Sequence, residues 1–275
     1  MTKTVVISGA TDGMGRAMAL ERLTRGDTMI AIGSNQAKGE ALAVAAGSAA
    51  DRLQFLRADL SSVAEVERVI AEIKATHRAV DALLLFANRV SARRMETADG
   101  YEYSFALYYL SRYLLSHKLT PLLERAARPV IVCVSGVGVT KGGINWDDPQ
   151  LTQKYSAVRA QLQAGRANDL LGVYYAEKFG GTVRFVHYHP GFTRSGDLSA
   201  VNPVVRTTIR TLARCAARPV DESVRPINDF IDNPPAAPLT AIDRGRILDL
   251  SLPTLDPRNA RRLASLTKDL LSTHN

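Results

Sequence analysis

The sequence predicts an α/β fold, in which helices cover both faces of a doubly wound, seven-stranded parallel sheet within a single domain. Two observations lead to this prediction. Short apolar runs rich in β-branched residues alternate with helical patterns along the chain, and strands covered by helices on both faces read as continuous apolar runs. The 275 residues, 46% apolar and 23% charged, also have the composition of one ordinary globular domain.

Seven segments have the length and composition of buried strands. They are TVVIS (4–8), TMIAIG (28–33), LQFLRA (53–58), VDALLLF (80–86), PVIVCV (129–134), TVRFVHY (182–188) and RILDLSL (246–252). Between the third and fourth strands, SVAE at 62–65 is a capping box that predicts a helix running toward Thr76. The proline-rich NPPAAP at 233–238 is interpreted as a loop before the last strand.

The two cysteines and the lengths of the apolar runs suggest a cytoplasmic location. Cys133 and Cys215 cannot form a disulfide framework, and Cys133 lies in an apolar run where it is expected to be buried. No run approaches the roughly 18 apolar residues of a membrane span, and the first apolar run is too short for a signal peptide. The net charge of +8 favours anionic ligands.

The first strand runs into SGATDGMGRAMA, in which Gly9, Gly13 and Gly15 form a G-x-x-x-G-x-G pattern. Glycines suit this position because the backbone must turn sharply and let a pyrophosphate approach the N-terminus of the next helix. The pattern follows a strand, opens a helix and is followed by a second strand about 20 residues later. It therefore predicts a dinucleotide-binding site.

With this loop, the chain resembles the short-chain dehydrogenase/reductases over nearly its whole length. RADLSS (57–62) is similar to the family's segment that holds the adenine, and HPGFTRS (189–195) to the segment beside the nicotinamide. TADGYEYSFALYYLSRYLLS (97–116) resembles the long helix between the fourth and fifth strands in the retinol dehydrogenase-like branch. The resemblance implies a Rossmann-type sheet of seven strands, with a substrate lid around residues 192–235.

The glycine loop and the resemblance together imply a set of cofactor-binding residues. These are Gly9, Thr11, Asp12, Gly13, Met14, Gly15, Ser34, Asn35, Asp59, Leu60, Ala87, Asn88, Ser135, Pro190, Gly191, Phe192, Thr193 and Ser195. After the second strand the chain reads GSNQAK, without the acid that would bind the ribose of NAD and repel a 2′-phosphate. Ser34 and Asn35 could bind that phosphate, with charge from Arg16 or Lys38. The predicted cofactor is NADP.

The catalytic residues of the family are an Asn, a Ser, a Tyr and a Lys, the last two spaced Y-x-x-x-K on one helical face. Aligning the flanking segments places Tyr108, Gly136, Gln161 and Gly165 at these four positions. All four are thus replaced, and the catalytic residues of this chain are unknown. Tyr108 is expected to pack or to contact a ligand rather than to donate a proton.

Several neighbouring residues could take the role of the replaced catalytic residues. Ser135 adjoins the serine position, but one step along a strand turns a side chain to the opposite face, which predicts that it is misdirected. Tyr155 and Arg159 keep the i,i+4 spacing six residues early, and a structural tyrosine is the stronger interpretation. Arg166 could reach a ribose or phosphate, but a solvated arginine on a helix face is favoured.

Two functions remain open for a reductase scaffold without its acid. In the first, hydride transfer persists and the substrate supplies the proton, since losing a general acid would otherwise cost roughly 10²- to 10⁴-fold in rate. The chain is similar in kind to atypical short-chain reductases without the Ser-Tyr-Lys triad, such as the angucyclinone ketoreductases of the simocyclinone type. This resemblance implies NADPH-dependent reduction of an aromatic polyketide ketone to a secondary alcohol in antibiotic biosynthesis. In the second, the chain is a non-catalytic NADP-binding redox sensor or scaffold.

Substrate contacts are expected from NRVSARRM (88–95), VTKGGINWD (139–147) and the lid. Trp146 could stack on a polycyclic ligand or serve as a packing anchor. Four lid arginines form a basic stripe, which is by default a solvated face and otherwise a contact for an acidic substrate group: Arg206, Arg210, Arg214 and Arg218. No motif supports a nucleic-acid partner. No metal site is expected, and a homo-oligomer remains open.

Overall fold

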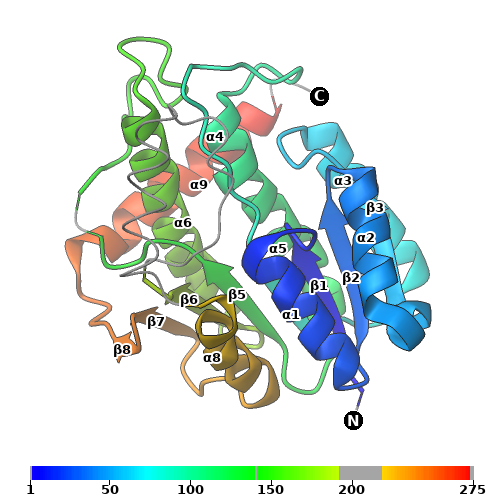
Figure 1. Ribbon diagram of the computed structural model, residues 1–275. Helices are drawn as coiled ribbons and strands as arrows, with labels where there is room; N and C mark the ends of the chain where they lie inside the picture. Colours follow the sequence, from blue (N-terminus) through cyan, green and yellow to red (C-terminus); the bar gives the residue numbers. More distant parts are fainter. Residues whose placement is uncertain (1, 140, 192–218, 273–275) are drawn as a thin grey trace.

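A computed structural model describes residues 2–139, 141–191 and 219–272. Its centre is one sheet in the order β3-β2-β1-β4-β5-β6-β7-β8 (Figure 1). All neighbours pair in parallel except β7 and β8. The strands are β1 Thr4–Ser8, β2 Thr28–Gly33, β3 Leu53–Arg57, β4 Ala82–Leu85, β5 Val130–Val134, β6 Arg184–His189, β7 Leu239–Asp243 and β8 Arg246–Ile247. The predicted α/β fold is confirmed, and the expected sheet of seven parallel strands is extended by β8, which is antiparallel.

The seventh strand was placed wrongly by the sequence. The predicted segment 246–252 contributes only the two residues of β8, which pair antiparallel to β7, and the parallel strand lies earlier, at Leu239–Asp243. Arg244 and Gly245 separate them with positive φ angles of 49° and 84°. Two successive residues with positive φ make a tight hairpin turn, so the chain reverses there and cannot continue in parallel.

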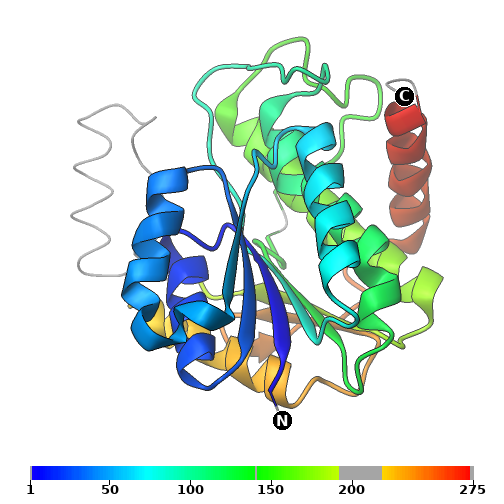
Figure 2. The ribbon, with the colours of Figure 1, turned by 90° about the vertical axis from the view of Figure 1, so that its right-hand side faces the viewer.

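Helices cover both faces of the sheet (Figures 1 and 2). The α-helices are α1 Gly13–Thr24, α2 Gln36–Ala46, α3 Val63–Thr76, α4 Tyr103–Phe105, α5 Ser111–Leu123, α6 Ala157–Phe179, α8 Val220–Asp232 and α9 Pro257–Ser272, with short 3₁₀ turns at Gly47–Arg52 and Pro253–Leu255. Helices α1, α2 and α8 bury one face of the sheet, whereas α3, α5 and α6 bury the other, with α9 packed on α6. Helix α3 begins as predicted, because Ser62 accepts a hydrogen bond from the Glu65 N–H at 3.4 Å.

The helical segment expected over 97–116 is interrupted. Helix α4 is a single turn, and a π-helical turn over Ala106–Leu110 separates it from α5. The Glu102 carboxylate caps this entry by accepting the N–H groups of Ser104 and Phe105 at 2.9 and 2.7 Å. The interruption matters because π turns are frequent at functional sites, and this one carries Tyr108.

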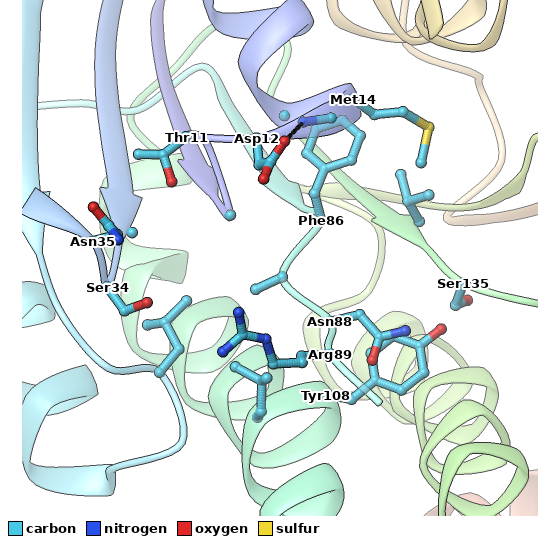
Figure 3. A pocket seen from close by; sticks show the side chains of 18 of the residues that line it. Thr11, Asp12, Met14, Ser34, Asn35, Phe86, Asn88, Arg89, Tyr108 and Ser135 are labelled. Carbon is cyan, nitrogen blue, oxygen red and sulfur yellow. Dashed lines mark hydrogen bonds between the residues drawn. The ribbon is translucent and has the colours of Figure 1, made fainter. Parts of the chain in front are cut away.

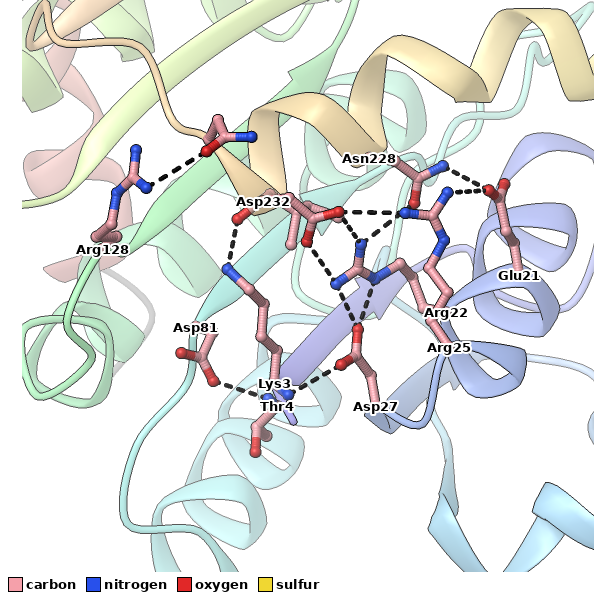
Figure 4. A network of polar contacts seen from close by, with 12 residues as sticks. Lys3, Thr4, Glu21, Arg22, Arg25, Asp27, Asp81, Arg128, Asn228 and Asp232 are labelled. Carbon is pink, nitrogen blue, oxygen red and sulfur yellow. Dashed lines mark hydrogen bonds and ion pairs between the residues drawn. The ribbon is translucent and has the colours of Figure 1, made fainter. Parts of the chain in front are cut away.

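A buried ion-pair network joins α1 to α8 at the amino end of the sheet (Figure 4). The Arg22 guanidinium donates to Asp27 at 2.6 Å and binds both carboxylate oxygens of Asp232 at 3.0 and 2.9 Å. Asn228 and Lys3 extend the network, since Lys3 donates its backbone N–H to Asp27 at 2.9 Å. Helix α8 is thereby fixed against the sheet.

The expected lid over 192–235 stays a prediction. Its final part, 219–235, is largely α8, which packs on α1 and β5 and contributes no residue to the pocket described below. The remainder of the lid, including Cys215 and the arginine stripe from Arg206 to Arg218, lies outside the described residues. None of the helices in the described part of the chain combines the length and the apolar character needed to cross a bilayer.

Candidate cofactor-binding and active site

A pocket of about 840 Å³ lies at the carboxyl edge of the parallel strands, where the loops after β1 to β6 meet (Figure 3). Its size is in the range of roughly 300–1,000 Å³ that small-molecule and cofactor sites occupy. Every described position predicted to bind the cofactor lines it: Gly9, Thr11, Asp12, Gly13, Met14, Gly15, Ser34, Asn35, Asp59, Leu60, Ala87, Asn88, Ser135, Pro190 and Gly191. Phe192, Thr193 and Ser195 lie outside the described residues.

The glycines of this loop allow its backbone to pack closely on itself and on the segment that follows β4. Gly9 has a φ of +75°, and a Cβ there would lie 2.9 Å from the backbone of Ala87. At Gly15 a Cβ would lie 2.1 Å from the Gly9 carbonyl oxygen. Asp12 caps α1 by accepting the Gly13 N–H at 2.8 Å. Gly13, Met14 and Gly15 of the first turn of α1 line the pocket, and the free N–H groups at a helix N-terminus can hold a pyrophosphate.

The end of β2 forms the part of the pocket that would hold the adenosine ribose. Ser34 and Asn35 line it, and Asn35 caps α2 by accepting the Lys38 N–H at 3.0 Å. The Lys38 ammonium group also lines the pocket and pairs with the Asp12 carboxylate. Arg16, the other cation considered, is not among the lining residues. Of Arg16 and Lys38, Lys38 is therefore the one that lines the pocket.

Sequence reasoning missed several residues of this pocket as cofactor-site residues: Gly33, Ala58, Phe86, Arg89, Tyr103, Leu107, Val134 and His189. Arg89 follows Asn88 directly, and its side chain extends toward the middle of the pocket (Figure 3). His189 directly precedes Pro190, and its Nδ1 is 2.8 Å from an Asp243 carboxylate oxygen. Arg89 and His189 could have been predicted as pocket residues, because each is adjacent in sequence to a predicted cofactor-binding residue. Tyr103 and Leu107 depend on how α4 and the π turn pack.

Ser135 and Gly136 both line the pocket, at the end that the family resemblance gives to the nicotinamide. β5 ends at Val134, so Ser135 directly follows the strand. Its Oγ is buried and interacts with the Cys133 thiol, and the expectation that this hydroxyl is misdirected stays a prediction. At Gly136 an added Cβ would meet only a Val139 methyl, at 3.5 Å.

Tyr108 enters the same end of the pocket from the π turn, with its hydroxyl directed toward Ser135 (Figure 3). Its side chain is largely buried, and the residue is 7% exposed. Burial raises the pKa of Tyr108 to about 12, although the Arg112 guanidinium and the Gly136 backbone N–H beside the phenol act to lower it. The phenol is therefore protonated at neutral pH and can donate a hydrogen bond.

Gln161 and Gly165, which we predict to occupy the positions of the family's Y-x-x-x-K pair, have no acidic side chain. The Gln161 amide donates to the Arg89 carbonyl at 3.3 Å, at the rim of the pocket. A Cβ added at Gly165 would meet nothing within 4 Å, so the space of a longer side chain is open. Neither residue lines the pocket itself.

The displaced pair lies away from the pocket. The Tyr155 hydroxyl donates to the Ser91 carbonyl at 3.2 Å, and Arg159 lines a separate groove of about 510 Å³ beside Gly142 and Leu162. Neither Tyr155 nor Arg159 lines the cofactor pocket.

The side chains of Arg166 and Trp146 both pack within the fold. The expectation that Arg166 is solvated is wrong, because it is 8% exposed and pairs with Asp169 at 2.8 Å. Arg166 also donates to the Val139 carbonyl at 2.9 Å. Trp146 packs against the hydrophobic core, with the Arg262 guanidinium 4.2 Å from its ring centroid. Of the two roles considered for Trp146, the structure places it as a packing anchor.

No group of three His, Cys, Asp or Glu side chains in the described ranges could hold a metal ion. The absence of a metal from the function stays a prediction.

Comparisons with known proteins agree with this geometry. A family model described as short chain dehydrogenase matches residues 3–157. Retinol dehydrogenase 14 of Mus musculus is 31% identical over 206 residues, which are 70% of this chain and only 62% of that protein. "Putative daunorubicin C-13 ketoreductase DnrU" of a Streptomyces species is 28% identical over 236 residues, covering 80% of each chain.

Among solved structures, a short chain dehydrogenase from Shigella flexneri 2a complexed with NADP has a TM-score of 0.68 at 17% identity, over 89% of this chain and 97% of that one. At this identity the likeness concerns the fold alone. The family model, by contrast, covers more than half of the 275 residues. The chain therefore belongs to the short chain dehydrogenase family of oxidoreductases.

Proposed function

We propose that this protein is an NADPH-dependent ketoreductase that reduces a ketone of a polycyclic aromatic polyketide to a secondary alcohol, with the proton supplied by the substrate. The observation that carries the proposal is the contrast between the glycine loop and the positions predicted for the family's acid pair. Gly9, Gly13 and Gly15 line the pocket, whereas Gln161 and Gly165, at the predicted acid positions, lie outside its lining and have no acidic side chain. The similarity to a ketoreductase named for daunorubicin supports the substrate class and a role in antibiotic biosynthesis.

The choice of NADPH over NADH is supported by the side chains at the end of β2. Ser34 and Asn35 offer polar groups, and Lys38 supplies a positive charge at the same place. A carboxylate that would repel a 2′-phosphate is absent from the residues directly after Gly33, which read SNQAK. When bound, the nicotinamide supplies the hydride for the ketone carbon.

The proton is proposed to come from a phenolic hydroxyl next to the ketone. Such a hydroxyl is held in a six-membered hydrogen-bonded ring, so little orientation entropy remains to be lost on reaction. It protonates the new alkoxide, and the phenolate left behind regains a proton from water. The protein then needs only to position the ketone and to stabilise the negative charge of the alkoxide. This requirement agrees with the lack of an acidic side chain at Gln161 and Gly165.

The test compares a hydroxylated polycyclic ketone with its O-methyl ether, following nicotinamide absorbance under NADPH. The hydroxylated ketone should be reduced, and the ether should react at least about 10²-fold more slowly, which is the size of a general-acid contribution. Binding of both compounds is measured separately, so that failure to enter the pocket is recognised. Similar rates for ketone and ether would overturn the substrate-assisted step.

One protein group needs its own control in that experiment. His189 is the histidine that lines the pocket among the described residues. Its replacement, His189→Asn, should leave the ratio of the two rates unchanged. A loss of the hydroxylated ketone's advantage in this variant would identify His189 as the donor. If NADPH binds and none of a panel of ketones is reduced, the redox-sensor function replaces the proposed one.

A further inference from the structure

Tyr108 and Gly136 are two replacements that complement each other in space. Gly136 stands where the family has a hydroxyl-bearing serine, and its own surroundings do not demand a glycine, since a Cβ would meet only Val139 at 3.5 Å. The Gly136 backbone N–H lies beside the Tyr108 phenol, and the phenol points toward Ser135 (Figure 3). A hydroxyl group is thus present beside the position from which the serine side chain is missing, but it comes from another helix.

The Tyr108 side chain is held in this position from two sides. The Tyr108 carbonyl accepts a hydrogen bond from the Asn168 amide at 2.8 Å, which fixes the π turn against α6. The Arg112 guanidinium lies 4.5 Å from the centroid of the tyrosine ring. A cation at this distance over the face of an aromatic ring is attracted to it, and here both groups are shielded from water. The hydroxyl direction is therefore set before any ligand enters.

Arg112 is itself an unusual residue, because it is fully buried without a carboxylate. Its exposed fraction is 0%. It donates to the carbonyls of Val134 and Ala87 at 2.9 and 3.1 Å and contacts the Cys133 thiol at 3.1 Å. No carboxylate lies within ion-pair distance of it among the described residues. Its charge is consequently not cancelled locally and favours negative charge that develops near the Tyr108 hydroxyl.

We propose that the Tyr108 hydroxyl donates a hydrogen bond to the reacting carbonyl oxygen and stabilises the alkoxide that forms there. This inference rests on the proposed ketone reduction and assigns that site a catalytic residue. Tyr108 keeps its own proton, so it does not replace the substrate's phenol as the source of the transferred proton. Arg112 acts as a positioning residue, through the ring of Tyr108.

The first experiment is Tyr108→Phe, which removes one oxygen atom and keeps the ring on Arg112. Removing one donor from an oxyanion site lowers kcat by about 10²- to 10³-fold, and a loss in this range is expected. NADPH affinity, followed by nicotinamide fluorescence, should stay within about twofold, since the hydroxyl is not needed to hold the dinucleotide. Tyr155→Phe is the matched control, because that hydroxyl binds the Ser91 carbonyl outside the pocket, and it should behave as wild type.

A rescue variant separates a lost hydroxyl from a general disturbance of the site. Gly136→Ser adds a hydroxyl beside the same space, and the gap around Gly136 admits its Cβ. In the Tyr108→Phe background, Gly136→Ser should restore kcat by about tenfold or more, a part of what one donor contributes. The proposal is overturned if Tyr108→Phe retains more than about a third of wild-type kcat, or if Gly136→Ser restores nothing.

A spectroscopic readout keeps this test independent of turnover. A hydrogen bond weakens a carbonyl double bond, so the C=O stretching frequency of a ketone bound beside NADP⁺ should fall in the wild type and rise toward its solution value in Tyr108→Phe. If wild-type protein reduces no ketone but still shows this difference, the proposed function fails and the Tyr108 contact survives. If ketones are reduced but the two frequencies are equal, the contact is wrong and the proposed function survives.

Discussion

Arg22 and Arg112, two of the buried arginines in the described part of the chain, lie at opposite ends of the sheet and are compensated in different ways. Arg22, at the amino end, has a side chain 3% exposed and binds Asp27 and Asp232, whose side chains are 4% and 36% exposed. Arg112, at the carboxyl end, is 0% exposed and binds two carbonyls, a thiol and the face of Tyr108. A buried charge is costly unless it is paired, so the two sites solve one problem with different partners.

The difference indicates what each arginine can do. The charge of Arg22 is balanced by carboxylates, so its effect is confined to joining α1 and α8. The charge of Arg112 is solvated in part by two carbonyls, a thiol and a π face, and its Nε has no hydrogen-bond partner among the described residues. No carboxylate of the described residues forms an ion pair with it, so its positive charge lies next to Tyr108. The first arrangement serves stability, whereas the second is suited to an anionic transition state.

The largest effect is expected from Arg22→Met. Removing one partner of a buried ion pair leaves the other charge uncompensated, which typically costs about 3–5 kcal/mol, and Asp27 would be the orphaned group. Urea unfolding measures the loss as a lower midpoint. Arg25→Met is the control, since Arg25 also pairs with Asp232 but its side chain is 44% exposed, and about 0–1 kcal/mol is expected. Equal losses for both variants would contradict the structural role assigned to Arg22.

Groups at the two ends of the sheet should change the free energy of unfolding in different pH ranges. Burial, with a smaller effect of Arg112, lowers the pKa of His187 to about 4 from its ordinary value of 6.5. The unfolded chain therefore takes up a proton that the folded chain refuses, so His187 by itself contributes a loss of stability of roughly 3 kcal/mol as the pH drops from 6.5 toward 4. His117, whose pKa burial also lowers to about 4, acts in the same direction, whereas Asp169, whose pKa burial raises to about 8, acts in the opposite direction.

The opposite end responds at lower pH. Burial opposes ionisation of Asp232, but its hydrogen bonds and charge interaction with Arg22 outweigh this and hold its pKa below the ordinary 3.8. Its contribution is complete above that value and disappears only as the pH falls through the lowered pKa. Unfolding free energies at several pH values test this order. His187→Gln should flatten the slope between pH 6.5 and 4, and an unchanged slope there would rule out His187 as its source.

Arg112→Met should reduce the reaction rate and cost less stability than Arg22→Met. It orphans no carboxylate, and the carbonyls that lose their donor cost about 1–3 kcal/mol of stability, less than Arg22→Met. The proposed reaction should slow by about tenfold, equivalent to one pKa unit or ~1.4 kcal/mol of charge stabilisation. Steady-state rates and urea unfolding on the same preparation provide both numbers. An unchanged kcat would mean that the charge of Arg112 does not reach the alkoxide.

The smallest effect concerns an exposed pair in the same pocket, Lys38 and Asp12, whose side chains are 47% and 68% exposed. Lys38→Met should weaken NADPH binding by about 0.5–1 kcal/mol, a two- to fivefold change, and leave NADH binding unaltered. Asp12→Asn keeps the cap on α1 and releases Lys38, so NADPH should bind more tightly. Calorimetry with both cofactors tests this. Equal losses for NADPH and NADH would show that Lys38 does not face the 2′-phosphate.

Local patterns were sufficient for six of the strands and for the glycine loop. TMIAIG became β2 with unchanged bounds, and the capping box at Ser62 began α3 where it was predicted. Gly9, Asp59 and Pro190 are far apart in the chain, yet they line one pocket because parallel strands direct their carboxyl ends to the same edge. The topology alone brings such residues together, so a sequence that reveals the strands also reveals this half of the site.

Tertiary structure decided the position of the last parallel strand, the environments of the buried arginines and the direction of the Tyr108 hydroxyl. The seventh strand lies earlier in the chain than predicted, because the turn at Arg244 and Gly245 reverses the chain. The runs on both sides of the turn are apolar, so the sequence pattern does not distinguish them. The environments of Arg112 and Arg166 could not be inferred, since an arginine reads as a solvated residue unless its buried partners are known. From the sequence by itself we predict that Gln161 and Gly165 replace the family's acid pair. The direction of the Tyr108 hydroxyl was set by a π turn and a buried guanidinium, because side-chain orientation follows from packing between distant segments and not from local pattern.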